Sequence, residues 1–151
     1  MPNRPPLYSL LEHARHRLEA AERNLSLLRR KEEEARQRLA ELEGYRREYH
    51  DRLAGASVNG MPIQLMRDYH VFLARIGQAI QHQGELVQQA HARWQTAHRQ
   101  WLAARRRLQA LEALAQRHRL REQERAKRLE QRTTDEHAQR TMRQRTTQGE
   151  P

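Results

Sequence analysis

The sequence predicts an all-α protein, a long antiparallel two-helix coiled-coil hairpin with an overhanging C-terminal helix. Three observations support this fold class. Hydrophobic residues make up only 36% of the 151-residue chain, against roughly 45–50% in globular domains, so a thick core is not expected. The apolar residues nevertheless recur at spacings of three and four over two long segments. A short glycine-containing stretch separates these segments, which favours helices that run in opposite directions.

The chain order predicts three parts. Residues 1–6 read M-P-N-R-P-P and are expected to form a flexible lead-in, because proline does not fit throughout a helix. Residues 7–132 are predicted to form the hairpin, with helices near 8–53 and 63–131 and a turn at 54–62. Residues 133–151 are polar, and we expect them to form a disordered tail.

The first helix follows from a heptad pattern without a slip. Its a positions are Leu11, Leu18, Leu25, Glu32, Leu39, Arg46 and Leu53. Its d positions are Leu7, Ala14, Ala21, Leu28, Ala35, Leu42 and Tyr49. Because a and d residues share one face of a helix, they should form a continuous seam against a partner helix.

The turn and the second helix come directly after this pattern in the sequence. Gly55 and Gly60 interrupt the first pattern, and Pro62 suits the first position of a new helix. The second helix has as its a positions Met66, Leu73, Ile80, Val87, Trp94, Trp101, Leu108 and Ala115. Its d positions are Tyr69, Ile76, Gln83, Ala90, Ala97, Ala104 and Leu111. After about residue 116 polar residues occupy both positions, so the seam should end there.

The register between the helices can be predicted from size and polarity. If the numbers of facing residues sum to 115, Trp94 faces Ala21 and Glu32 faces Gln83. Large side chains then meet small ones, and the one acidic residue of the first seam meets the one amide of the second. Registers shifted by a heptad place Glu32 or Gln83 against aliphatic residues. We therefore predict the register of 115.

One edge of the hairpin, in the half toward the turn, carries exposed apolar side chains at g positions and their neighbours. These are Tyr45, Leu65, Phe72, Ala79 and Leu86. Such a cluster indicates a partner site, and a wider core or a dimer contact would give the same pattern. On the opposite edge Gly77 and Gly84 either loosen the helix, allow a close approach, or are neutral on an exposed face.

The sequence lacks the patterns of catalytic and cofactor sites. It has no cysteine, no phosphate-binding loop and no metalloprotease motif. His91 and His98, like His13 and His16, have no third ligand nearby, so solvated surface histidines are expected rather than a metal site. No stretch is long and apolar enough to span a membrane. The chain is therefore not expected to be an enzyme or to bind a cofactor or small-molecule substrate.

The net charge of +10 requires nucleic-acid binding to be weighed. Residues 1–54 are nearly balanced, with 12 cationic and 10 anionic side chains, whereas residues 105–151 carry 13 against 7. The excess therefore lies in the overhang and tail, without the basic region that precedes a zipper in bZIP proteins. An acidic protein surface would serve as a partner equally well.

Four segments resemble the FliJ family of flagellar export proteins. They are L-E-G-Y-R-R-E-Y at 42–49, L-M-R-D-Y-H-V-F-L-A-R-I-G-Q-A-I at 65–80, W-L-A-A-R-R-R-L-Q-A-L-E-A-L at 101–114 and E-Q-R-T-T-D-E-H-A at 130–138. The resemblance implies a non-catalytic stalk in the ring of the flagellar export ATPase, located in the cytoplasm and associated peripherally with the inner membrane. It also implies contacts with the linker of the membrane export gate and with export chaperones. The related stalk of a virulence type III secretion system and a basic coiled-coil nucleic-acid binder stay open as alternatives.

The resemblance also implies site residues. The export-gate contact falls on Leu42, Tyr45, Tyr49, Phe72, Ile76, Ala79 and Gln83. The ATPase contact uses the end that bears both termini, where the candidates are Arg105, Arg106, Arg107, Arg117, Arg119 and Arg121. No catalytic, cofactor-binding or metal-binding residue is implied.

Overall fold

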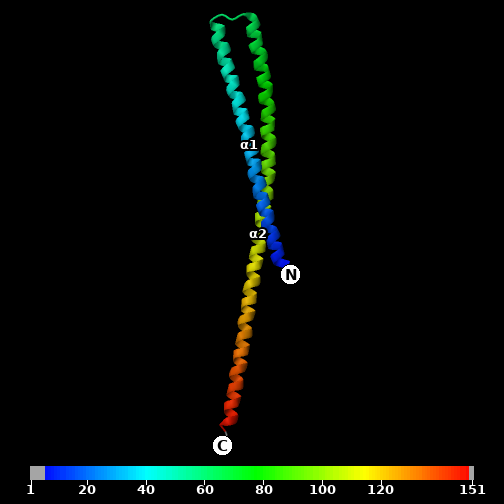
Figure 1. Cartoon of the computed structure of the whole chain (residues 1–151), viewed down its shortest axis with the longest axis vertical. Helices are drawn as coiled ribbons and strands as arrows, with labels where there is room; N and C mark the ends of the chain where they lie inside the picture. Colours follow the sequence, from blue (N-terminus) through cyan, green and yellow to red (C-terminus); the bar gives the residue numbers. More distant parts are fainter. Residues whose placement is uncertain (1–5, 150–151) are drawn as a thin grey trace. The chain divides into compact units, whose positions relative to one another are not determined.

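The computed structural model of the chain describes residues 6–149 and contains two long helices (Figure 1). Helix α1 spans Pro6–Val58, and helix α2 spans Ile63–Gln148. No strand occurs within this part of the chain. The predicted fold class, an all-α coiled-coil hairpin, is confirmed. The described residues of the helices form two compact units, one of residues 16–105 and the other of the two end segments, 6–15 and 106–149.

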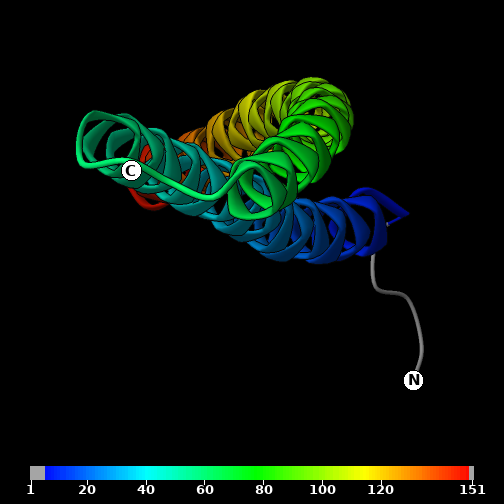
Figure 2. The same ribbon diagram turned by 90° about the horizontal axis from the view of Figure 1, so that it is seen from above.

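The turn of the hairpin is shorter than predicted and occupies residues 59–62 (Figure 2). Helix α1 continues past Gly55, which is flanked by two alanines, the best helix formers. The Ser57 hydroxyl in its last turn donates a hydrogen bond to the Leu53 carbonyl at 2.8 Å. Gly60 then adopts a φ of 84°, the left-handed conformation that glycine accommodates without steric cost after a helix end. At the start of α2, the Met66 amide donates to the Pro62 carbonyl at 3.1 Å and closes the first turn of this helix.

The heptad seam is confirmed. Every predicted a and d residue of both helices is buried or half-buried. The most buried among them in the 16–105 unit include Leu73, Ile76, Val87 and Ala97. Most residues at the other heptad positions are exposed, as expected for a narrow apolar stripe on an otherwise solvated helix.

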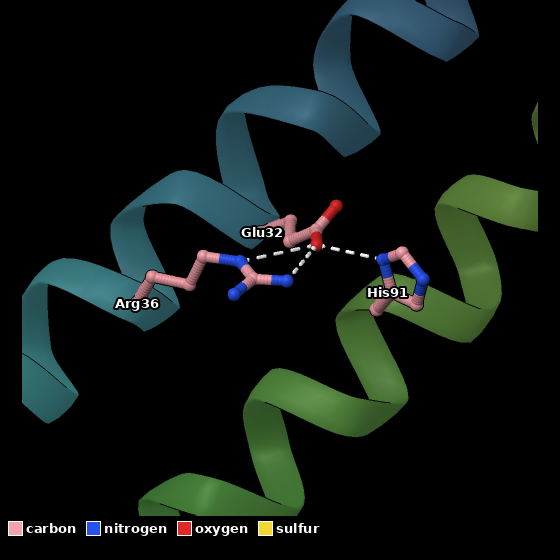
Figure 3. Close-up of polar contacts among 3 residues, drawn as sticks. All are labelled: Glu32, Arg36 and His91. Carbon is pink, nitrogen blue, oxygen red and sulfur yellow. Dashed lines mark hydrogen bonds and ion pairs between the residues drawn. The ribbon is translucent and has the colours of Figure 1, made fainter.

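The predicted contact between Glu32 and Gln83 is wrong. Gln83 instead donates its amide to the backbone carbonyl of Ala35 at 3.0 Å, and Glu32 contacts His91 at 2.8 Å (Figure 3). The facing numbers sum to 118 for the first pair and 123 for the second, not 115. Side chains lean toward the N-terminus of their own helix, which raises such sums in an antiparallel pair. Gln83 contacts the backbone carbonyl of Ala35, however, so no α1 side chain is involved in this contact. The lean of α1 side chains therefore does not explain why this sum exceeds 115.

The predicted end of the seam near residue 116 is confirmed, but the predicted end of the helix is not. Ala115 is the last buried residue, and α2 then continues to Gln148 with almost every side chain exposed. The expectation of a disordered tail at 133–151 is therefore wrong as far as residue 148. Residues 133–148 include three arginines and three glutamines, which are good helix formers, but also five threonines, which are weaker ones. Threonine hydroxyls in this stretch donate to the carbonyls four residues earlier.

The predicted lead-in, residues 1–6, lies outside the described residues except for Pro6. Pro6 is the first residue of α1. Proline is favoured at this position because its missing amide proton would have no partner within the helix.

Candidate functional site

An apolar groove lies beside the turn, within the 16–105 unit. It is lined by Tyr49 of α1 and by Leu65, Asp68, Tyr69 and Phe72 of α2. The helix positions explain this composition, since Tyr49 and Tyr69 are d residues at the edge of the seam and Leu65 and Phe72 are the adjacent g residues. We call this set of five residues the aromatic groove.

The rings of the aromatic groove pack against one another. The Tyr49 ring lies edge-on to Phe72 with centroids 4.5 Å apart and is tilted against Tyr69 at 6.3 Å. The Arg52 guanidinium lies 5.4 Å from the centroid of Tyr49. These contacts hold the rings in place while 41% of Phe72 remains exposed. The groove thus presents an ordered apolar surface next to the carboxylate of Asp68.

The seven residues expected at the export gate do not all reach the surface. Tyr45 is 53% exposed, and Phe72 and Ala79 are also exposed. The other members are Leu42 and Tyr49, which are half-buried, and Ile76 and Gln83, which are 8% and 9% exposed.

The two buried residues are seam residues at d positions, and the Gln83 amide is occupied by the Ala35 carbonyl. They can support a docking surface from beneath, but they do not present it. The seven residues expected at the export gate did not include three residues of the aromatic groove, namely Leu65, Asp68 and Tyr69. Of these, Leu65 was recognisable from its g position, whereas the place of Asp68 depends on how α1 and α2 pack.

The arginines expected at the ATPase are exposed but belong to different units. Arg105 is in the 16–105 unit, where its guanidinium lies 5.4 Å from the centroid of the Trp101 ring. The other five are in the unit of the chain ends. Arg117, Arg119 and Arg121 form no ion pair within residues 6–149, so their charges are not neutralised there.

A polar cluster links the two helices midway along the 16–105 unit (Figure 3). One Glu32 carboxylate oxygen accepts hydrogen bonds from Arg36, at 3.2 Å from Nε and 2.8 Å from Nη2, and contacts His91 Nδ1 at 2.8 Å. The hydrogen bond from Arg36 is the main cause that lowers the pKa of Glu32 below its ordinary value. Burial acts in the opposite direction, and the hydrogen bond and charge of His91 add to the lowering.

Two histidines expected to be solvated are partly covered instead. His91 and His98 are half-buried and stack on either side of Trp94, at centroid distances of 5.8 and 5.2 Å. His98 also lies 5.8 Å from the Trp101 ring. Both histidines therefore pack along the seam edge, and His91 also makes the polar contact with Glu32.

The described residues hold no group of three or more histidine, aspartate or glutamate side chains able to bind a metal ion. Over the same residues, neither helix includes an apolar segment sufficient to cross a bilayer. The exposed features described above are the aromatic groove and the arginines that form no ion pair within residues 6–149.

The chain is similar to a known protein family and to a solved structure. The model of the family described as "Flagellar FliJ protein" matches residues 3–147. No curated protein sequence matches the chain. Among solved structures, that of a putative YscO homolog from Chlamydia trachomatis is similar at 19% sequence identity, with 98% of this chain and 99% of the other covered and a TM-score of 0.47.

Proposed function

The chain belongs to the FliJ family of flagellar export proteins, and from this we propose that it is the stalk of the flagellar export ATPase. In this role it sits in the ATPase ring and couples the ring to the linker of the membrane export gate and to export chaperones. It performs no catalysis of its own. Family membership over residues 3–147 is the observation that carries the proposal.

The aromatic groove supports the gate contact. Aromatic side chains that are held in place and half exposed lose little conformational entropy when a partner covers them, which makes them effective binding anchors. The proposed contact consists of Leu42, Tyr45, Tyr49, Phe72 and Ala79, with Ile76 and Gln83 beneath them in the seam. Leu65 and Tyr69 extend the surface toward the turn.

The exposed arginines support the ATPase contact. Cationic groups without internal partners raise the rate at which an acidic surface is found, and salt weakens this effect. Arg106, Arg107, Arg117, Arg119 and Arg121 are exposed for such a contact. Arg105 contributes less in this proposal because its guanidinium already packs on Trp101.

The gate contact is tested by binding of the purified export-gate linker to the full chain. Tyr45→Ala combined with Phe72→Ala should weaken binding by at least about tenfold, because two exposed aromatic anchors are removed. Val71→Ala is the matched control, since Val71 is also an exposed apolar residue but does not line the groove. Helicity should be unchanged in all variants. Equal binding by the double variant and the control would refute the gate assignment.

The ATPase contact is tested separately, by the ATP hydrolysis rate of the export ATPase with and without the chain. Addition of the chain should raise the rate by promoting ring assembly. Changing Arg117, Arg119 and Arg121 to glutamine should abolish most of the increase, because the charges that attract the ring are lost. An unchanged rate on addition of the wild-type chain would refute the stalk function itself.

A further inference from the structure

A second groove lies in the unit formed by the two end segments of the chain. It runs between the first turns of α1 and a two-turn stretch of α2, and the residues that line it are Leu7, Leu10, Leu114, Arg117, His118 and Arg121. We call it the leucine–arginine groove. Three aliphatic side chains and three basic ones thus share one concave surface.

The leucines of this groove are left open by the end of the seam. Leu11 and Ala115 are buried, whereas Leu10 is 44% and Leu114 is 50% exposed. Every residue from 116 to 140 is exposed. Covering the two leucines would remove apolar surface from water, which is favourable in proportion to the area covered.

The basic side chains of the groove are not neutralised within the described residues. Arg117 and Arg121 form no ion pair there. The next two carboxylates along α2, those of Glu122 and Glu124, form ion pairs with other arginines. Glu122 lies 3.6 Å from Arg125, and Glu124 lies 3.2 Å from Arg128. A ligand that enters the groove therefore meets two unpaired guanidinium groups beside the leucines.

We propose that the leucine–arginine groove binds a short acidic, leucine-rich helical segment of a protein partner. A helix can present aliphatic side chains toward Leu10 and Leu114 and carboxylates toward Arg117 and Arg121 at the same time. Carboxylates also form paired hydrogen bonds with guanidinium groups, which fixes the position of the segment.

Other occupants fit less well. A nucleic acid offers phosphates to the arginines but no aliphatic groups to the leucines. A second copy of this chain would bring a further net charge of +10 to a basic site, which opposes association. The proposal rests on the proposed ATPase contact, with which it shares Arg117 and Arg121, and adds recognition of aliphatic groups by the leucines. The test below uses peptides and no ATPase, so failure of this proposal is distinguishable from failure of the stalk function.

The test measures binding of labelled peptides to the full chain by fluorescence anisotropy at physiological salt. The first peptide has leucines at helical spacing and glutamates elsewhere. The second keeps the glutamates but replaces the leucines with serine, and the third keeps the leucines but replaces the glutamates with lysine. We expect the first peptide to bind at least about tenfold more tightly than either of the others, because only it satisfies both parts of the groove.

Variants with matched controls locate the binding site. Leu114→Gln should weaken binding of the first peptide by about fivefold, whereas Leu129→Gln, at another exposed leucine of α2, should not. The double variant of Arg117 and Arg121 to glutamine should weaken it by about tenfold. The charge-matched double variant of Arg140 and Arg143, outside the groove, should leave it within about twofold.

Three results would overturn the proposal. The first is no binding of the glutamate–leucine peptide. The second is equal binding of the serine or lysine peptide, which would mean attraction by charge alone or by apolar contact alone. The third is equal weakening by the groove variants and their controls, which would place binding elsewhere on the helix. Because all of these residues are exposed, circular dichroism should confirm that each variant folds.

Discussion

Replacing Glu32 with glutamine should destabilise the hairpin by about 1 kcal/mol at neutral pH. The side chain of Glu32 is only 12% exposed, and its contact with His91 joins α1 to α2 at 2.8 Å. A hydrogen bond to a charged group contributes about 1.5–3 kcal/mol when both partners are well ordered, and toward the lower end where one partner, such as His91, is partly exposed. The Arg36 contact lies within α1, between residues four apart, and adds about 0.3–0.5 kcal/mol. Glutamine keeps an acceptor oxygen but loses the charge, so part of the total is retained.

The assay is urea unfolding followed by far-ultraviolet circular dichroism. Glu48→Gln is the matched control, because Glu48 pairs with Arg52 at 2.9 Å within α1 and the pair is exposed. The control should cost only about 0.3 kcal/mol. A cycle that combines Glu32→Gln with His91→Gln isolates the contact between the helices, since the effects of residues in contact are not additive.

The pH dependence of this difference has a definite sign. The pKa of Glu32 in the folded chain lies below its ordinary value of 4.5. The contact therefore contributes fully above pH 4.5 and is lost as the pH falls through the folded pKa. The gap between wild type and Glu32→Gln should persist at neutral pH and close in acid. Equal stability of the two proteins at neutral pH, or a gap that widens in acid, would refute the reasoning.

Three further predictions concern packing and helix length. Ala97→Leu should destabilise the hairpin by about 1–3 kcal/mol in urea unfolding, because Ala97 is buried in the seam. Gly84→Ala should instead stabilise it by about 1 kcal/mol in the same assay, since a Cβ at this position meets nothing within 4 Å and the helix gains propensity. Truncation after Arg132 should reduce the molar helical signal but leave the unfolding midpoint unchanged, because the removed part of α2 has almost no buried residues; a shifted midpoint would contradict this.

The glycine prediction also bears on two readings of Gly77 and Gly84. The open space around both positions excludes a close approach by other parts of the described chain. If Gly84→Ala raised the stability without weakening partner binding, the glycine would be a neutral residue on an exposed face of the helix. A loss of binding would point to a partner that approaches the helix closely there.

The sequence by itself predicted the elements because helical periodicity is a local property. Residues seven apart lie on one face of a helix whatever its partner, so the seam and its end near Ala115 could be derived without coordinates. The helix boundaries were predicted less well, at Val58 and at Gln148. In both cases apolar periodicity ended before the helix did, because the backbone hydrogen bonds of a helix can continue where its side chains bury nothing.

Only the tertiary structure decided which residues meet across the helices. Alanine and leucine recur along both seams, so polar contacts help to select among the registers. The match of Glu32 with Gln83 was chemically reasonable, yet His91 takes the carboxylate, and Gln83 bonds to main chain.

The two kinds of surface were predictable to different degrees. The exposed edge at Tyr45 and Phe72 followed from heptad positions alone. The two grooves, in contrast, are lined by residues distant in the chain, which only the tertiary structure places side by side. Asp68 thus joins Tyr49 in the aromatic groove, and Leu10 joins Leu114 and Arg117 in the leucine–arginine groove. Periodicity specifies the face of a helix on which a residue lies, whereas the fit of side chains between two helices specifies its neighbours.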